Sequence, residues 1–254
     1  MAEQKKLINS VHRALTIVDL FTEKRTAWKL SEISRELDLN KSTVHGLLRT
    51  LMHHGYVAQD PESEKYKLGL RFAEKGNLVM ADLDVRRIAR PYLEEITAKY
   101  GDATHLAVLD EGEAVYIEKM EGHSAIGMYS RVGKRAPLYC TAVGKVLASG
   151  ETAASIRELA GKQTYARHTE HTIKSQEEFI EAVRTAAENG YALDDEELEL
   201  GLRCVAVPIF DSQRKIAAAL SMSGPVTRLK KENLDEITAD LKEHAKKISS
   251  QLGF

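Results

Sequence analysis

The chain has 254 residues, of which 43% are hydrophobic and 29% are charged, and it contains two cysteines. This composition is that of an ordinary globular protein. It excludes a collagen-like chain or a disulfide scaffold, and the apolar runs are too short to span a bilayer. Two domains are expected at this length, and a cytoplasmic location is expected because the start of the chain lacks the apolar core of a signal peptide.

The net charge of −2 is unevenly distributed along the chain. Residues 1–75 hold 13 Lys and Arg against 10 Asp and Glu, and the remainder holds 23 against 28. The first segment therefore carries +3 and the rest −5, a weak asymmetry that favours nucleic-acid binding in the N-terminal part.

Three helices and a hairpin are predicted within the first 70 residues. The first helix follows Ser10 as its N-cap. The second covers residues 30–37, with Thr26 or Ser31 as the cap, and the third covers 41–55 and stops at Gly55. The segments YVAQ and KYKL flank a turn that contains proline, and they predict a two-stranded hairpin. The apolar stripe that the first helix is expected to bury in the core of this domain comprises Val11, Leu15, Val18 and Phe21. The order helix, helix, turn, helix, hairpin is typical of a winged helix-turn-helix.

The rest of the chain mixes helices with strands, which predicts an α+β or α/β domain. A linking helix is predicted over 70–83, and a second helix over 84–101 contains Pro91. Two hairpins are predicted, one from THLAVL with AVYIEKM and one from RCVAVPIF with IAAALSMSG, and AIGMYSR is expected to add a strand. Further helices are predicted over 141–149, 151–160, 175–189 (with Ser175 and Glu178 at capping-box spacing) and Thr227–Gln251.

The third predicted helix has one face that suits DNA. On a helical wheel, Val44, Leu47, Leu48 and Leu51 lie on one side, opposite Ser42, Gly46, Arg49 and His53. No carboxylate occurs between Asn40 and Gln59, whereas a face that contacts only water normally mixes both signs. Arg49 is expected to read guanine, and Lys41 with the helix N-terminus is expected to hold phosphates. The alternative is that this face is merely solvated. The predicted DNA contacts are Lys41, Ser42, Thr43, His45, Arg49 and Lys65, whereas Asp60, Glu62 and Glu64 at the hairpin tip should be repelled by phosphate.

Three stretches of this region, RALTIVDLF, LSEISRELDLNKSTVHGLLRTLMHHGYV and YKLGLRF, resemble the DNA-binding domain of the IclR family of bacterial regulators. The resemblance continues through ARPYLEEI, SRVGKRAPLYCTAVGKVLAS, GYALDDEELELGLRCVAVPIFD and SMSGP, and so covers nearly the whole chain. It implies a homodimer, often a dimer of dimers, that binds near-palindromic operator DNA. One departure is Gly46, where that family often carries arginine, so either DNA approaches closely there or base reading has moved to neighbouring residues.

The resemblance also implies a GAF-like C-terminal domain that binds a small organic acid or aromatic metabolite. The positions that match its pocket are Ala142, Val143, Asp194, Cys204, Ser221 and Ser223. Ser221 and Ser223 are two residues apart, so both hydroxyls project from one face of a strand, and backbone N–H groups near Ala142 can receive a carboxylate. The alternatives are that the serines bond within the core edge, that Cys204 only fills space and that the run DDEELE is a solvated loop.

An enzyme is the main competing interpretation. The GK of TAVGK fails as a phosphate loop, because Tyr139 and Val146 stand where glycine and a hydroxyl residue are required. A zinc site from Cys204, Asp194 and one of His105, His123, His168 or His171 is chemically possible, but no metal or cofactor is expected.

The expected fold is therefore α+β: a winged helix-turn-helix DNA-binding domain over 1–75, a linker helix over 76–90 and a GAF-like α/β effector-binding domain over 91–254. The expected function is that of a DNA-binding regulator, a repressor rather than an enzyme, whose operator affinity is controlled by a small organic acid. Its expected partners are double-stranded operator DNA, the effector and a second copy of the chain, with no membrane.

Overall fold

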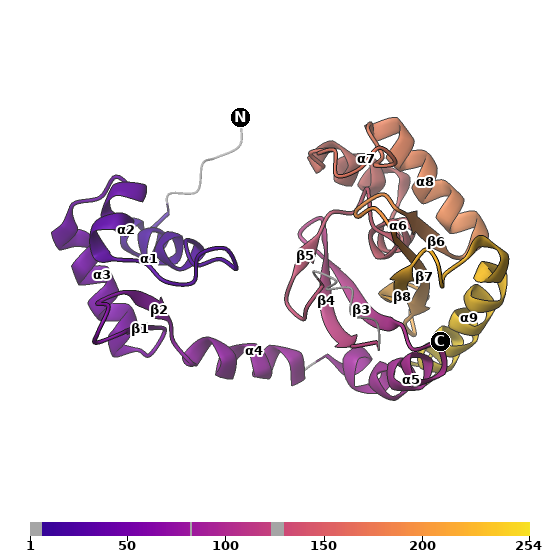
Figure 1. Ribbon diagram of the computed structural model, residues 1–254, viewed down its shortest axis with the longest axis horizontal. Helices are drawn as coiled ribbons and strands as arrows, with labels where there is room; N and C mark the ends of the chain where they lie inside the picture. The colour runs from indigo at the N-terminus through magenta and orange to yellow at the C-terminus, as the bar shows by residue number, and fades with distance from the viewer. Residues whose placement is uncertain (1–6, 82, 123–129) are drawn as a thin grey trace. The chain divides into compact units, whose positions relative to one another are not determined.

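The computed structural model describes residues 7–81, 83–122 and 130–254. The chain divides into two compact units, Met1–Asp82 and Leu83–Phe254 (Figure 1), and the division falls inside the predicted linker 76–90. Within the described residues, no helix is both long and apolar enough to cross a membrane.

Unit 1 is a winged helix-turn-helix, as predicted. Asp38 takes a positive φ of 49° in the turn between the second and third helices, and the Ser34 hydroxyl donates to Leu39 O at 2.6 Å across that turn. Gly55 ends the third helix with φ of 76°, where Tyr56 N donates back to Leu51 O at 2.9 Å. Its elements are α1 (Asn9–Asp19), α2 (Leu30–Glu36), α3 (Lys41–His53), β1 (Val57–Gln59), β2 (Tyr66–Leu68) and α4 (Arg71–Ala81).

The predicted buried stripe of α1 is wrong in part. Ile17 is the fully buried residue of this helix, whereas Val11 and Leu15 are 54% and 59% exposed. Apolar residues occupy much of the circumference of α1, so spacing alone does not identify the face that packs in the core. Ser10 lies inside the helix, which begins at Asn9. The predicted caps of α2 are also wrong, because Lys29 occupies the N-cap and its N–H donates to Glu32 at 2.8 Å.

Trp28 connects several parts of unit 1. Its backbone N–H donates to Tyr66 O at 3.0 Å and its carbonyl accepts from Tyr66 N at 2.7 Å, which extends the β1–β2 hairpin by one bridge. Its indole N–H donates to Leu20 O at 3.0 Å, and the guanidinium carbon of Arg25 lies 3.4 Å from the centre of the ring system. Trp28 thus ties the hairpin to the end of α1 within one core.

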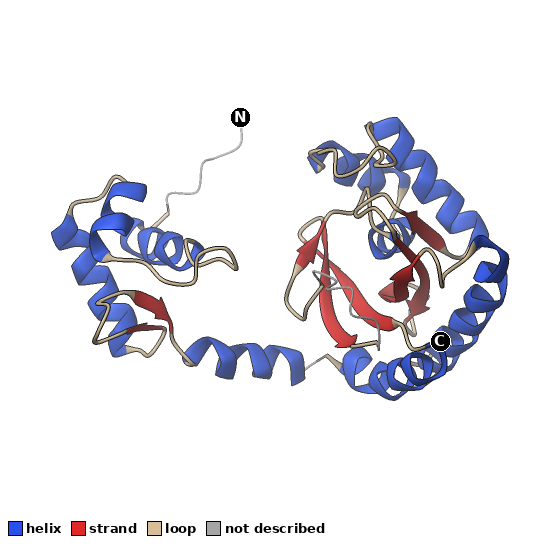
Figure 2. Cartoon of the chain, in the orientation of Figure 1, coloured by secondary structure: helices blue, strands red, loops and turns tan. Residues whose placement is uncertain are grey.

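Unit 2 is built on a six-stranded antiparallel sheet (Figure 2) of order β5-β4-β3-β8-β7-β6. The strands are β3 (Ala103–Asp110), β4 (Glu113–Met120), β5 (Arg135–Ala136), β6 (Ala192–Asp195), β7 (Leu202–Phe210) and β8 (Ile216–Pro225). The helices are α5 (Asp84–Tyr100), α6 (Ala142–Ser149), α7 (Ala153–Lys162), α8 (Gln176–Asn189) and α9 (Leu234–Gln251), the last preceded by the short 3-10 helix η1 (Lys231–Asn233).

Helices cover both faces of this sheet. On one face, α5 packs against β3 and β4, and α9 packs against β7 (Figure 1). On the other face, α6 contacts β3, β4, β6, β7 and β8, so the sheet curls around it, while α7 and α8 pack beyond α6. Alternation along β8 shows the two sides, because Leu220 and Met222 face one core and Ala219, Ser221 and Ser223 face the other. The predicted fold class is confirmed.

Several elements of unit 2 differ from the predicted ones. Neither β5 nor β6 is predicted from the sequence, and β6 includes the first residues of a run expected to be a solvated loop. The last helix begins at Leu234 rather than Thr227, because residues 225–229 form a turn in which Leu229 N donates to Pro225 O at 2.9 Å. Ser175 caps α8 as predicted. The Glu178 carboxylate, however, accepts a hydrogen bond from Lys174 N rather than from Ser175 N. Most of the predicted strand AIGMYSR lies outside the described residues.

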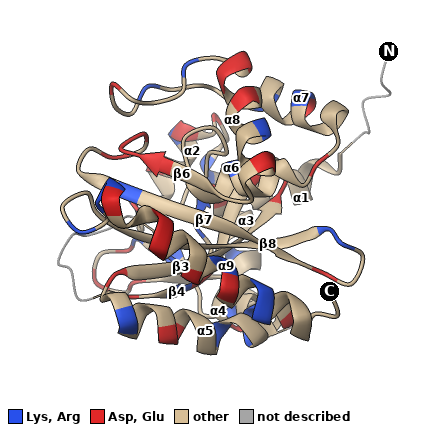
Figure 3. Ribbon diagram, turned by 90° about the vertical axis from the view of Figure 1, so that its right-hand side faces the viewer, with Lys and Arg blue, Asp and Glu red and all other residues tan. Residues whose placement is uncertain are grey.

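Acidic and basic residues alternate along the exposed side of α5 (Figure 3). Arg87 pairs with Asp84 at 2.8 Å and Arg90 with Glu94 at 3.1 Å, one turn apart in each case. Such exposed pairs each contribute about 0.3 to 0.5 kcal/mol, so this face is a solvated helix surface.

Candidate functional site

The face of α3 that the sequence assigned to DNA is exposed. Lys41, Ser42, His45 and Arg49 lie outward, while Val44 and Leu48 are fully buried in the core of unit 1. Within the described part of the chain, the four outward side chains have no hydrogen bond or ion pair. A row of polar groups held out on a helix, and not used by the protein itself, is available to a partner. Thr43 is half-buried at the edge of this row.

Gly46 lies on the same helix and has open space around it, because an added Cβ would meet nothing within 4 Å. Packing inside unit 1 therefore does not require glycine here. A glycine inside a helix costs about 1 kcal/mol relative to alanine, so this residue is not explained by the fold of unit 1.

The hairpin tip is acidic, and one of its carboxylates, Asp60, is hydrogen-bonded within the tip itself. The Asp60 carboxylate accepts from Ser63 N at 2.8 Å and from the Ser63 hydroxyl at 2.7 Å, and these bonds lower the pKa of Asp60. Lys65 is half-buried at the base of the hairpin, near Glu32.

Unit 2 contains a cavity of about 490 Å³ between the sheet and the start of α6. All six positions that the sequence matched to an effector pocket line this one cavity: Ala142, Val143, Asp194, Cys204, Ser221 and Ser223. Their roles as ligand contacts stay a prediction, but the fold brings them together from β6, β7, β8 and α6.

Strand register explains the floor of the cavity. In one row across the sheet, Asp194 pairs with Cys204 and Cys204 pairs with Ser223. In the next row, Ser221 pairs with His105. Directly paired residues of antiparallel strands project to the same face, and so do residues two apart, so these five side chains form a continuous patch. The floor thus carries a carboxylate at one edge and an imidazole at the other.

The start of α6 forms another wall. The Thr141 hydroxyl caps the helix by accepting from Gly144 N at 3.2 Å, and it donates to Pro137 O at 2.6 Å. An added Cβ on Gly144 would lie 2.4 Å from Leu138 Cα, so glycine is needed for the loop to pass this close. The backbone N–H groups of Ala142 and Val143, at the first turn, have no intrahelical acceptor. Because both residues line the cavity, this turn offers neutral donors to an anion.

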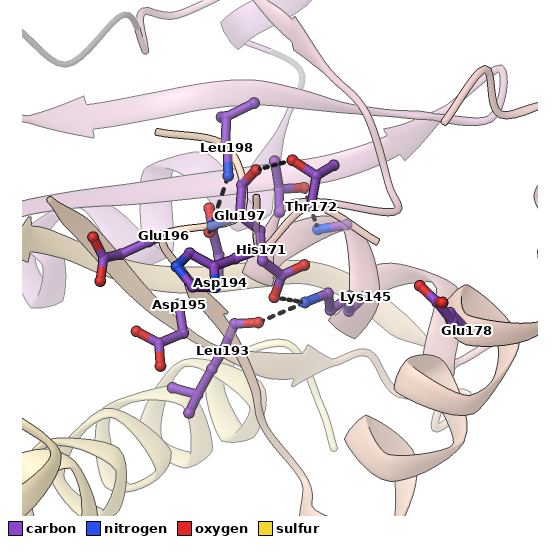
Figure 4. Close-up of polar contacts among 12 residues, drawn as sticks. Lys145, His171, Thr172, Glu178, Leu193, Asp194, Asp195, Glu196, Glu197 and Leu198 are labelled. Atoms are coloured by element: carbon purple, nitrogen blue, oxygen red, sulfur yellow. Dashed lines mark hydrogen bonds and ion pairs between the residues drawn. The ribbon is translucent and has the colours of Figure 1, made fainter. Parts of the chain in front are cut away.

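A buried polar network holds the loop beside Asp194 (Figure 4). Asp194 Oδ1 accepts from Glu197 N at 2.8 Å and from Leu198 N at 3.3 Å. Lys145 extends from α6, and its ammonium donates to Leu193 O at 2.8 Å and pairs with Glu197. The Thr172 hydroxyl donates to Glu197 O at 2.7 Å. Both charged ends of the Lys145–Glu197 pair are largely shielded from water, and Glu197 Oε2 has no hydrogen-bond partner among the residues that the structure describes.

Burial sets the charge state of the groups that line the cavity. It lowers the pKa of His105 to about 3, with a further contribution from Lys119, so the imidazole is neutral at pH 7. Burial and the neighbouring Glu197 raise the pKa of Asp194 to about 7. Burial also raises the pKa of the Cys204 thiol, which therefore stays protonated.

Several lining residues were not found from the sequence. His105 was noted only as one possible metal ligand, but it lies on the floor with Nε2 2.7 Å from the Ser130 hydroxyl. Tyr116 lies beside it, with ring centres 5.3 Å apart, and His168 lines the wall with Nε2 3.1 Å from the Tyr139 hydroxyl.

Two cationic residues, Lys134 and Arg135, also line the cavity, and Arg135 pairs with Asp110 and Glu113. No local signal marks these residues, because the fold brings them together over long sequence separations.

The zinc hypothesis gains no support from this geometry. Among residues 7–81, 83–122 and 130–254, no three His, Cys, Asp or Glu side chains are grouped so as to hold a metal ion. His123 lies outside the described residues. His171 is half-exposed, 4.0 Å from Glu170.

Comparison with known proteins relates this architecture to bacterial regulators. Residues 77–250 match the family model for the bacterial transcriptional regulator IclR C-terminal domain, and residues 10–61 match the IclR helix-turn-helix domain. The HTH-type transcriptional regulator XynR of Escherichia coli K12 is 42% identical over 248 residues, which cover 98% of each chain. KdgR of the same strain is 38% identical over 252 residues, covering 99% of this chain and 95% of that one. The crystal structure of the Thermotoga maritima IclR is 31% identical with a TM-score of 0.78, covering 97% of this chain and 99% of that one.

Proposed function

Since the chain belongs to the IclR family of bacterial transcription regulators, a family of DNA-binding proteins rather than enzymes, we propose that it is a repressor whose operator affinity is set by a small organic acid. The effector would bind in the cavity of unit 2. The observation that carries this proposal is that all six pocket positions line the same cavity. With DNA as its partner, we place the protein in the cytoplasm.

For DNA, the supporting feature is the row of exposed, unpartnered side chains on α3. A helix that projects a guanidinium and hydroxyls suits the major groove, where arginine bonds guanine through O6 and N7. Lys41 and Ser42 at the helix start suit phosphates, which attract both the ammonium and the helix N-terminus.

Arg49→Ala is expected to weaken binding to the operator by about 1 to 3 kcal/mol, because a lost bidentate contact to a base removes that much discrimination. Its effect on unrelated DNA should be smaller. The matched variant Lys41→Ala is expected to weaken both kinds of DNA alike and to flatten the salt dependence, as removal of a phosphate contact does. Gel-shift titrations on an operator selected from random DNA measure both effects. Unchanged operator affinity in Arg49→Ala would remove this face of α3 from base recognition.

For the effector, the chemistry of the cavity favours a small carboxylate. The first turn of α6 offers backbone N–H groups, and the floor offers the Ser221 and Ser223 hydroxyls. The cavity holds a metabolite-sized molecule, and an anion held by neutral donors needs no buried cation. Neutral His105 at the far edge suits a hydroxyl or carbonyl of the same ligand.

Replacing Ser221 and Ser223 together by alanine is expected to weaken binding of the effector by about 1 to 3 kcal/mol, because two hydrogen bonds are lost. Operator affinity without effector should stay nearly unchanged, because the DNA-binding side chains belong to the other compact unit. The double variant should then need more effector for the same operator response, since a ligand acts only through its differential affinity for two states. Calorimetry beside gel-shift titration measures both quantities. Effector affinity equal to that of the wild type would exclude the serines from the site.

We extend the proposal to self-association as a two-fold dimer, with a dimer of dimers as the larger form. The apolar residues Leu7, Val11 and Leu15 recur every four residues along the start of the chain, and all three are more than half exposed. They supply apolar surface that the core of unit 1 does not use. A dimer also reads two half-sites, which one helix-turn-helix alone does not contact.

A further inference from the structure

Asp194 lies in an unusual place for a receptor of organic acids, because it adds a carboxylate to the floor of the cavity. It is 2% exposed, and its neighbours in the same row are Cys204 and Ser223. Asp194 Oδ1 accepts hydrogen bonds from Glu197 N and Leu198 N of the loop, whereas no described residue donates a hydrogen bond to Oδ2. One carboxyl oxygen is therefore fixed to the loop, and the other is left for what enters the cavity.

The surroundings do not compensate a second negative charge at this position. Among the described residues, the cation that acts on Asp194 is Lys145, whose ammonium already donates to Leu193 O and pairs with Glu197. Lys134 and Arg135 also line the cavity, but they lie at β5, at the opposite end of the sheet from β6. When Asp194 is ionised, Asp194 and Glu197 together with Lys145 leave one net negative charge in this buried corner. The titratable and charged groups that act on Asp194 from the packed elements are Lys145 from α6, Glu197 from the loop, Cys204 from β7, Cys140 before α6 and Tyr116 from β4. The last three are neutral at pH 7, because burial raises the pKa of each.

We propose that Asp194 and the carboxylate of the bound effector share one proton, so that each effector anion enters the cavity together with a proton from solvent. This inference rests on the function proposed above and names Asp194 as a residue that selects carboxylates. Two carboxylates held side by side in a water-poor site do not both ionise, and the pair keeps one proton between them. The carboxyl group of Asp194 then donates through Oδ2 to the effector, while Oδ1 keeps its two bonds to the loop.

The proton makes effector affinity depend on pH in a stated direction. In the effector-free protein the pKa of Asp194 is about 7, and a second carboxylate beside it raises that pKa further. Below pH 7 Asp194 already carries the proton, so affinity should stay level until the effector itself is protonated. Above pH 7 the proton must be taken up on binding, so affinity should fall by about tenfold for each pH unit.

Calorimetric titration of the full chain tests this, with acetate, pentanoate and benzoate as probes on both sides of pH 7. Above pH 7, the binding heat in two buffers of different ionisation enthalpy should report an uptake that approaches one proton. Asp194→Asn should bind the same probes without proton uptake and with level affinity, because the amide N–H₂ permanently supplies the donor and the amide oxygen still accepts from the loop. The matched control Ser221→Ala should lower affinity at every pH and leave the slope and the proton count intact.

The outcomes separate the inference from the proposed function. A probe that binds the wild type with level affinity and no proton uptake above pH 7 would overturn the shared proton and leave the organic-acid effector standing. Proton uptake that persists in Asp194→Asn would place the proton elsewhere and overturn the inference too. If no probe binds at any pH, the proposed class of effector is itself contradicted. Circular dichroism is the folding control: the spectrum of Asp194→Asn should match that of the wild type before the two affinities are compared.

Discussion

Replacing Lys145 by methionine is expected to lower the free energy of unfolding by about 3 to 5 kcal/mol, because it leaves a buried carboxylate without its cation. The side chain of Lys145 is 5% exposed and that of its partner Glu197 is 13% exposed, so water does not replace the lost ammonium. Leu193 O also loses a donor. Thermal or urea unfolding followed by circular dichroism measures the loss.

The loss should depend on pH in a predictable direction. Asp194 has a folded-state pKa of about 7 against an ordinary value of 3.8, so the folded protein holds the proton more tightly than the unfolded chain. Stability from this group is present at acidic pH and is lost as the pH rises through 7. Lys145 lowers the pKa of Asp194, so its removal favours the protonated form of Asp194 further, and the variant should be least damaged in acid.

A surface pair offers the matched control. Lys162→Met removes the partner of Glu158 on α7, where both side chains are more than half exposed, and it should change stability by less than about 1 kcal/mol. If Lys145→Met and Lys162→Met lost the same amount, the buried pair would not have the role described. If Lys145→Met fails to fold, the double variant with Glu197→Gln should restore folding, since it removes the orphaned charge.

Leu15→Glu is expected to weaken the proposed dimer by about 3 to 6 kcal/mol, because a two-fold interface contains the substitution twice and each buried leucine contributes about 1.5 to 3 kcal/mol. Unit 1 itself should fold normally, since Leu15 is 59% exposed and not part of its core. Light scattering against concentration measures the association, and operator affinity should fall with it.

Leu200→Glu serves as the control for this experiment. Leu200 is 61% exposed, close to the value for Leu15, but it lies in unit 2 on the loop after β6. The same change of charge there should leave dimerisation intact if Leu7, Val11 and Leu15 form the interface. A wild-type chain that is monomeric at micromolar concentration, with and without operator DNA, would contradict the proposed dimer altogether.

The fold followed from local sequence patterns wherever a single element was strongly periodic. Helix α3 and the two long strands β7 and β8 have clear spacing and clear turn residues, and they lie where they were expected. The two-residue strand β5 has no periodicity to detect. Strand β6 carries two aspartates, and it exists because it pairs with β7 and because Asp194 is bonded by its own loop. Tertiary pairing, rather than propensity, decides such short strands.

The candidate site was predictable in part for a related reason. Ser221 and Ser223 share a face by their spacing alone, whereas Asp194, Cys204 and the α6 positions came from the family resemblance. His105 was not assigned to the cavity, because its place beside Ser221 depends on the pairing of β3 with β8, although 115 residues separate the two in the sequence. The sheet order β5-β4-β3-β8-β7-β6 sets those neighbours, and no spacing within one segment reports it.

The position of Trp28 gives this protein a built-in optical label. It is the one tryptophan among 254 residues, and it belongs to the core of unit 1, whereas the nine tyrosines are spread over the chain. Light at the red edge of the absorption band excites indole and not phenol, so the emission it produces comes from unit 1 alone. Release of Trp28 from Arg25 and from Leu20 O changes the polarity around the ring, and hence the colour of that emission. Comparison of the fluorescence signal with far-ultraviolet dichroism therefore separates the melting of unit 1 from that of unit 2 in an unlabelled chain.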